Sequence, residues 1–161
     1  MPAKRIKIIT GPIHSGKTSR ISNWVKARND CAGILSPVID NMRYLYSIHS
    51  KKIRLLEVEN LLSDTSKIVS IGRYTFSKEI FNWGQKELLQ GFNGNFQWLI
   101  IDEIGPLELQ GQGLEPTVGQ IIEKYKLSNH NQLLLVVRDQ LLEKFISHYG
   151  LSKHTIDFVN L

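Results

Sequence analysis

The sequence has a single cysteine and no long hydrophobic run. Cys31 cannot form a disulfide within the chain, and it cannot hold a metal ion by itself. The longest apolar stretches, such as Leu133–Val137, are far shorter than the roughly 20 residues that span a bilayer. The apolar run near the N-terminus is also too short for a secretory signal. These absences predict a cytoplasmic protein that has no membrane partner.

Acidic residues are scarce in the first third of the chain. Residues 1–56 hold 11 Lys or Arg and two acids, Asp30 and Asp40, whereas residues 57–161 hold 9 basic and 13 acidic residues. A basic segment can bind nucleic acid or can surround a site for phosphate ligands. The basic residues are scattered and accompany no aromatic-rich RNA motif, so we favour a phosphate ligand over nucleic acid. The 42% hydrophobic content is enough for one core, and we expect one domain over residues 1–161.

Apolar segments typical of strands alternate with amphipathic segments typical of helices. This alternation predicts a three-layer α/β fold whose mainly parallel sheet is covered on both faces. The expected strands are 5–10, 31–35, 96–101, 132–137 and 155–159, and the expected helices are 18–28, 77–90, 116–126 and 140–149. Residues 42–49 and 52–57 alternate apolar and polar side chains, which predicts an inserted β-hairpin. The segment 61–76 is ambiguous, with 67–71 as a candidate short strand.

The phosphate-loop motif G-x-x-x-x-G-K-[ST] is present at every fixed position between Gly11 and Thr18. It directly follows the first strand and precedes the first helix, as such a loop must. Lys17 can reach the β and γ phosphates, and the Thr18 hydroxyl can ligate Mg²⁺. We read His14 as a variable loop position rather than a catalytic group. The residues expected to bind ATP, GTP or another nucleoside triphosphate are Gly11, Pro12, Ile13, His14, Ser15, Gly16, Lys17, Thr18 and Ser19.

A second acidic motif follows the apolar strand at 96–101. Asp102 stands where a Walker-B aspartate orients the Mg²⁺ shell, so we expect Asp102 to join Thr18 as a metal-binding residue. Glu103 comes next, at the strand end where ligands bind in open α/β sheets. We therefore expect Glu103 to orient and polarise the attacking water, with Lys17 as the second catalytic group.

The segment Asp102–Leu109 closely resembles the signature D-E-I-G-x-M-E-L. This signature belongs to a small family of P-loop nucleoside-triphosphatases that was first described in thermophiles and includes the human cancer-related nucleoside-triphosphatase. Three more stretches are similar in order and spacing: Thr10–Thr18, Gly33–Pro37 and Ile71–Phe76. The resemblance spans roughly residues 5–150.

The resemblance implies a RecA-like P-loop core and slow Mg²⁺-dependent hydrolysis of several nucleoside triphosphates. By this resemblance, phosphate and metal would be bound by Gly16, Lys17 and Thr18. Asp102 would orient the metal shell, and Glu103 would orient the water. Two departures are His14, where the family often has glycine, and Leu107, which replaces methionine.

Three further charged residues are candidates for the site. Arg138 lies just past a core strand and is our third catalytic candidate, because an arginine there can stabilise charge on the γ-phosphate. Arg73 could play the same part, although an ordinary surface salt bridge is an equal interpretation for both arginines. Glu108 could serve as an alternative base or could brace the loop at Gly105 and Pro106.

Three functions fit these motifs, and hydrolysis of a nucleoside triphosphate to diphosphate and phosphate is the first. A small-molecule or nucleotide kinase is the second, with the 43–54 hairpin as a candidate lid. The third is a nucleotide-gated binding protein, although the sequence has no N-K-x-D guanine motif, which also suggests broad base tolerance. Four aromatic residues could stack on a base, but we favour packing for each: Trp24, Tyr46, Tyr74 and Trp83. A protein partner and an oligomeric state are not predicted.

Overall fold

The structure is a computed structural model that describes residues 4–59, 64–127 and 131–161. Its strands are β1 (Ile6–Gly11), β2 (Cys31–Leu35), β3 (Val38–Ile39), β4 (Met42–Ser47), β5 (Lys52–Leu55), β6 (Ile68–Ile71), β7 (Tyr74–Ser77), β8 (Trp98–Ile104), β9 (Gln132–Arg138) and β10 (Ile156–Phe158). Its α-helices are α1 (Lys17–Lys26), α2 (Lys78–Asn93), α3 (Pro106–Leu109), α4 (Thr117–Leu127) and α5 (Leu142–His148). Two 3₁₀ turns, η1 (Thr65–Lys67) and η2 (Asp139–Leu141), complete the described elements. None of these helices is long and apolar enough to cross a membrane.

The strands in the described ranges form one large sheet and one separate hairpin. The large sheet has eight strands in the order β10-β1-β9-β8-β2-β4-β3, with β5 paired to β4. All pairs from β10 to β2 are parallel, whereas β4 is antiparallel to β2, β3 and β5. The predicted mainly parallel sheet is confirmed.

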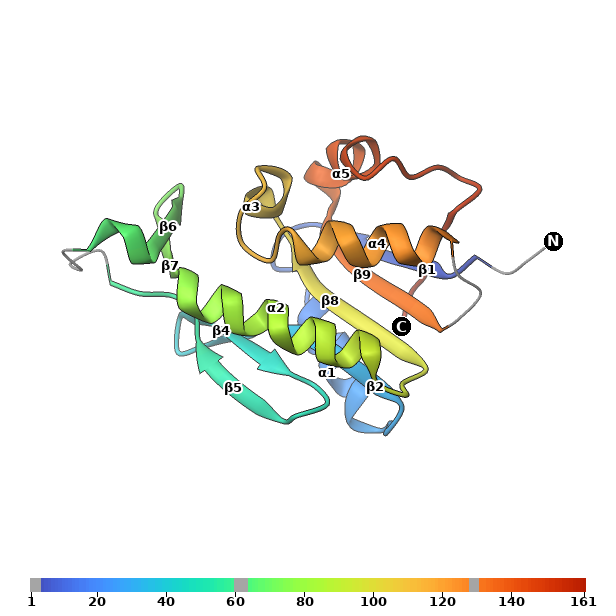
Figure 1. Ribbon diagram of the computed structural model, residues 1–161, viewed down its shortest axis with the longest axis horizontal. Helices are drawn as coiled ribbons and strands as arrows, with labels where there is room; N and C mark the ends of the chain where they lie inside the picture. Colours follow the sequence, from blue (N-terminus) through green and yellow to red (C-terminus); the bar gives the residue numbers. More distant parts are fainter. Residues whose placement is uncertain (1–3, 60–63, 128–130) are drawn as a thin grey trace.

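The helices cover both faces of this sheet, with α1 behind it and α2 and α4 in front (Figure 1). Side chains alternate between the two faces along each strand. On β9, Leu134 and Val136 pack with Ile21 of α1, whereas Leu133 and Leu135 belong to the larger core that includes α2, α4 and α5. The nearly continuous apolar strands of the sequence are therefore strands buried on both faces.

The strand register brings the ends of the central strands together. Gly11, the last residue of β1, pairs with Arg138, the last residue of β9. The β8–β9 register is regular up to Ile101 and shifts before Ile104, so Asp102 and Glu103 lie within an irregular stretch of the ladder. Residues that are distant in sequence thereby meet at the carboxyl ends of the central strands.

Several elements differ from the sequence-based expectation. The inserted hairpin is hydrogen-bonded to β2 through β4, so it extends the main sheet. The candidate strand at 67–71 is observed as β6 and has an unexpected partner, β7, while residues 61–63 of that ambiguous segment lie outside the described residues. Ser77 caps α2 as predicted, but the helix continues to Asn93 and ends at Gly94. A short helix, α3, occupies the start of the expected loop after β8.

Candidate active site

The phosphate loop connects β1 to α1, as its motif predicts. Residues Pro12–Gly16 are exposed, and His14 and Gly16 have φ values of 60° and 82°. Gly16 is the N-cap of α1, and its left-handed backbone favours a residue without a Cβ. The N-terminus of a helix presents free N–H groups and the positive end of its dipole, so this loop is built to receive an anion.

The Lys17 side chain lies within the loop rather than in solvent. Its residue is only 5% exposed, and Nζ donates to the carbonyl oxygens of Gly11 at 3.2 Å and Pro12 at 2.7 Å. The Ser15 hydroxyl is a third partner at 3.3 Å. Lys17 thus holds a fixed positive charge at the end of β1.

Asp102 is fully buried at the end of β8, beside β2. Its Oδ2 accepts a hydrogen bond from the Ser36 amide at 3.2 Å, and its backbone oxygen accepts one from the Ser36 hydroxyl at 2.5 Å. Its Oδ1 has no hydrogen-bond partner among the described residues. Burial raises the pKa of Asp102 to about 6, although the Ser36 amide and the Thr18 hydroxyl favour its charged form.

This buried carboxylate and the Thr18 hydroxyl fit a magnesium ion. Mg²⁺ is held by one or two carboxylates together with waters and substrate phosphates, so it needs no cluster of protein ligands. The described residues contain no group of three His, Cys, Asp or Glu able to hold a metal. A cation at the unpartnered Oδ1 would also offset the cost of burying the charge of Asp102.

Glu103 and Arg138 form an ion pair at the same edge of the sheet. The Arg138 Nε lies 3.1 Å from Glu103 Oε1, and their side chains are 27% and 18% exposed. Because Arg138 pairs with Gly11 across the sheet, this couple lies beside the start of the phosphate loop. The structure therefore brings together the groups that the sequence predicts from three separate segments.

Glu108 braces the loop after β8. It is 4% exposed, and its two carboxylate oxygens accept hydrogen bonds from the Gly105 amide at 2.8 Å and the Leu114 amide at 2.9 Å. Burial raises the pKa of Glu108 to about 7, against the effect of these two donors. Of the two roles open at the sequence level, the geometry favours the brace, because both oxygens are occupied by backbone groups.

Arg73 is not brought to the phosphate loop by any contact of the described residues. It lies exposed in the turn between β6 and β7, and its Nη2 donates to the Tyr74 hydroxyl at 2.9 Å. Two of the aromatic candidates pack against other side chains: the Trp24 ring lies edge-on to Trp98, and Trp83 lies under the guanidinium of Arg54.

Sequence reasoning missed two residues near Asp102. Ser36 contacts Asp102 directly, and Arg43 Nη1 donates to the Ser36 carbonyl at 2.8 Å. The positive charge of Arg43 also favours the charged form of Asp102. The sequence held two signals for Ser36: its place in the Gly33–Pro37 stretch that resembles the family, and its position before Pro37 at the end of a strand.

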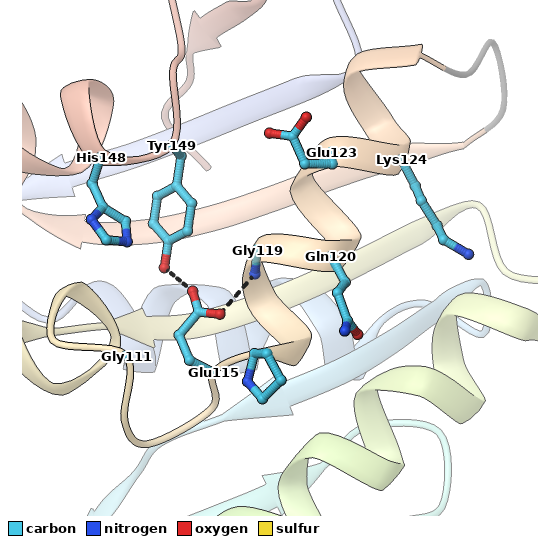
Figure 2. Close-up of a pocket in the computed structure, with 9 residues that line it drawn as sticks. Gly111, Glu115, Gly119, Gln120, Glu123, Lys124, His148 and Tyr149 are labelled. Atoms are coloured by element: carbon cyan, nitrogen blue, oxygen red, sulfur yellow. Dashed lines mark hydrogen bonds between the residues drawn. The ribbon is translucent and has the colours of Figure 1, made fainter.

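A hollow of about 690 Å³ lies elsewhere, between α4, α5 and the loop at Gly111 (Figure 2). Glu115 bridges its two sides, because its carboxylate accepts hydrogen bonds from the Tyr149 hydroxyl and from the Gly119 amide. Its lining includes no predicted site residue. The hollow is therefore separate from the phosphate loop.

The phosphate loop between β1 and α1, the parallel sheet and the acidic end of β8 define a P-loop NTPase. The chain belongs to the NTPase family, whose sequence model matches residues 7–160, and it is an enzyme that hydrolyses nucleoside triphosphates. This confirms the resemblance read from the segment Asp102–Leu109.

Two solved structures share the fold. The crystal structure of THEP1 from the hyperthermophile Aquifex aeolicus has a TM-score of 0.65 and 18% sequence identity, covering 97% of this chain and 89% of that one. The solution structure of a human cancer-related nucleoside triphosphatase has a TM-score of 0.66 and 18% identity, covering 99% of this chain and 89% of that one. Comparison with curated proteins finds no significant match.

Proposed function

We propose that this enzyme hydrolyses nucleoside triphosphates to diphosphate and phosphate in a magnesium-dependent reaction with broad base tolerance. The observation that carries the proposal is the buried Oδ1 of Asp102, which has no hydrogen-bond partner in the described part of the chain and lies at the strand ends beside Lys17 and the Glu103–Arg138 pair. The single buried thiol and the family are compatible with a cytoplasmic enzyme made of one domain.

Each group has a distinct task in this proposal. The amides of the phosphate loop and Lys17 bind the β and γ phosphates, while Thr18 and Asp102 hold Mg²⁺, which supplies charge neutralisation on the phosphate oxygens. Glu103 orients a water for in-line attack on the γ-phosphorus. The new bond joins the water oxygen to phosphorus, the bond to the β–γ bridging oxygen breaks, and the water proton leaves through the Glu103 carboxylate.

In this proposal Arg138 can contact both the Glu103 carboxylate and the γ-phosphate. Its ion pair with Glu103 fixes that carboxylate, and its guanidinium has further N–H groups for a γ-phosphate oxygen. Charge stabilisation of this kind contributes strongly in other phosphoryl-transfer enzymes. Arg138 is therefore both an orienting and a charge-stabilising group in the proposal.

The test is a phosphate-release assay with ATP, GTP, CTP and UTP, each with Mg²⁺ or with EDTA. We expect release from all four only when Mg²⁺ is present. Glu103→Gln should lower the rate by roughly 10²- to 10⁴-fold and leave nucleotide binding intact, since it removes the base but no phosphate contact. Lys17→Ala should weaken both nucleotide binding and hydrolysis. Glu143→Gln, at an exposed position of α5, is the matched control.

Product analysis with candidate acceptors separates hydrolysis from phosphoryl transfer to a second molecule. The 43–54 hairpin is hydrogen-bonded into the main sheet through β4, which favours a fixed element over a mobile kinase lid. Magnesium-independent release, or release that needs an acceptor, would overturn the proposal.

A further inference from the structure

The end of β2 contacts β8 in an unusual way at Asp102. The parallel pairing of the two strands is regular through Ile34 and Ile101. Beyond it, the Asp102 backbone oxygen and side chain are both bound by one residue, Ser36. A buried carbonyl that the ladder does not serve needs another donor, and the Ser36 hydroxyl supplies it at 2.5 Å.

The two Ser36 contacts hold Asp102 at two points, its backbone carbonyl and its carboxylate. The hydroxyl fixes the backbone of Asp102, and the amide occupies Oδ2 at 3.2 Å. Because the two carboxylate oxygens are equivalent, only a half-turn of the group restores the second contact, and any smaller rotation breaks it. Oδ1 is consequently the oxygen that stays free for another ligand, and it has no partner among the described residues.

Ser36 is itself held in place. It is 7% exposed, and the following Pro37 disfavours a helical backbone at Ser36, which keeps the chain extended toward β8. Its carbonyl accepts from Arg43 Nη1 at 2.8 Å, and the backbone amide of Arg43 donates to Glu57 at 3.2 Å. Through Arg43, the β3–β5 part of the sheet thus holds the Ser36 backbone in place.

We infer that Ser36 is a positioning residue of the magnesium site: its hydroxyl fixes the backbone of Asp102, which keeps one carboxylate oxygen on the Ser36 amide and leaves the other free for the metal. This inference rests on the proposed magnesium site. Residues that orient a metal ligand through hydrogen bonds commonly change metal affinity by about 10- to 100-fold when they are replaced. Ser36 binds neither phosphate nor water in this role, so its removal should affect the metal alone.

The test measures binding of a fluorescent ATP analogue while Mg²⁺ is titrated, first in EDTA and then at increasing Mg²⁺. Ser36→Ala should raise the Mg²⁺ concentration at half-effect by about tenfold and leave the affinity in EDTA unchanged. Ser36→Thr keeps the hydroxyl and should restore most of the wild-type Mg²⁺ dependence.

Ser47→Ala is the matched control. Ser47 is fully buried and also donates a short hydrogen bond, but to Glu87 at 2.6 Å. Its removal should lower the melting temperature about as much as Ser36→Ala and leave the Mg²⁺ dependence unchanged.

Three results would overturn the inference: no change in Ser36→Ala, an equal change in Ser47→Ala, or an equal loss of affinity in EDTA. Failure of the wild type to release phosphate, with Mg²⁺-dependent binding intact, would refute the proposed hydrolysis and leave this inference standing. Nucleotide binding that ignores Mg²⁺ in the wild type would overturn both.

Discussion

Replacing the buried carboxylate of Asp102 by an amide should abolish metal binding and make the fold more stable. Asp102 is 0% exposed, and burial raises its pKa from 3.8 to about 6. A carboxyl group whose pKa is higher in the folded protein binds its proton more tightly there. Its contribution to stability is therefore complete below the unfolded pKa of 3.8 and is lost as the pH rises through about 6. The difference sets a ceiling of ~3 kcal/mol lost at neutral pH in the absence of metal.

Asp102→Asn has no charge to bury, and its amide oxygen can still accept from the Ser36 amide. In EDTA near pH 8, we expect the melting temperature to rise by up to about 10 °C, because ~1 kcal/mol shifts a domain of this size by about 2–4 °C. The gain should disappear near pH 4, where wild-type Asp102 is protonated. The same variant should lose Mg²⁺-dependent nucleotide binding.

Circular dichroism melts at several pH values, in EDTA, measure this effect. Asp40→Asn is the control, because Asp40 is exposed and has a φ of 50°, a conformation that asparagine also tolerates. A variant no more stable than the wild type near pH 8 would show that the buried charge costs little. A gain that persists at low pH would show that its cause is packing rather than ionisation.

Three further predictions concern the scaffold. Glu108→Ala should lower the free energy of unfolding by roughly 2–4 kcal/mol, because two backbone N–H groups lose their acceptor; an unchanged urea midpoint would contradict the brace. Gly33→Ala places a Cβ 2.0 Å from the Ile100 oxygen at a φ of 120°, so it should cost more than about 4 kcal/mol, and wild-type melting would disprove that close approach. Cys31 is 4% exposed and burial raises its pKa to about 11, so a thiol reagent should label it only after unfolding; rapid labelling of the folded protein would argue against its burial.

The parts of the site that the sequence predicts are those encoded within one short segment. The phosphate loop is a local motif between a strand and a helix, and Asp102 and Glu103 directly follow an apolar strand. Arg138 was reachable by the same logic, because parallel strands end at the same edge. Its pairing with Glu103 depends on register and becomes visible only in the structure.

The parts that the sequence does not predict depend on contacts between distant segments. Ser36 and Asp102 are separated by 66 positions and meet where the regular β2–β8 pairing has ended. The sequence indicates β6 as a candidate strand but not its partner β7, because both strands are short. Gly72, which has a φ of 57°, was a turn signal between them. Glu108 could be an alternative base or a brace by its sequence, and only its two backbone donors separate these roles.

The site draws its groups from the start of α1 and from the ends of β1, β9, β8 and β2, which are four neighbouring strands in the large sheet. Backbone amides in such a centre exchange with solvent only through openings close in cost to global unfolding, whereas marginal hairpins open more cheaply. The β6–β7 hairpin can therefore fray without dispersing the groups around the phosphates, whereas β4 supports Ser36 through Arg43 and must stay paired. An enzyme built in this way should lose activity on warming when the sheet itself melts, and not before.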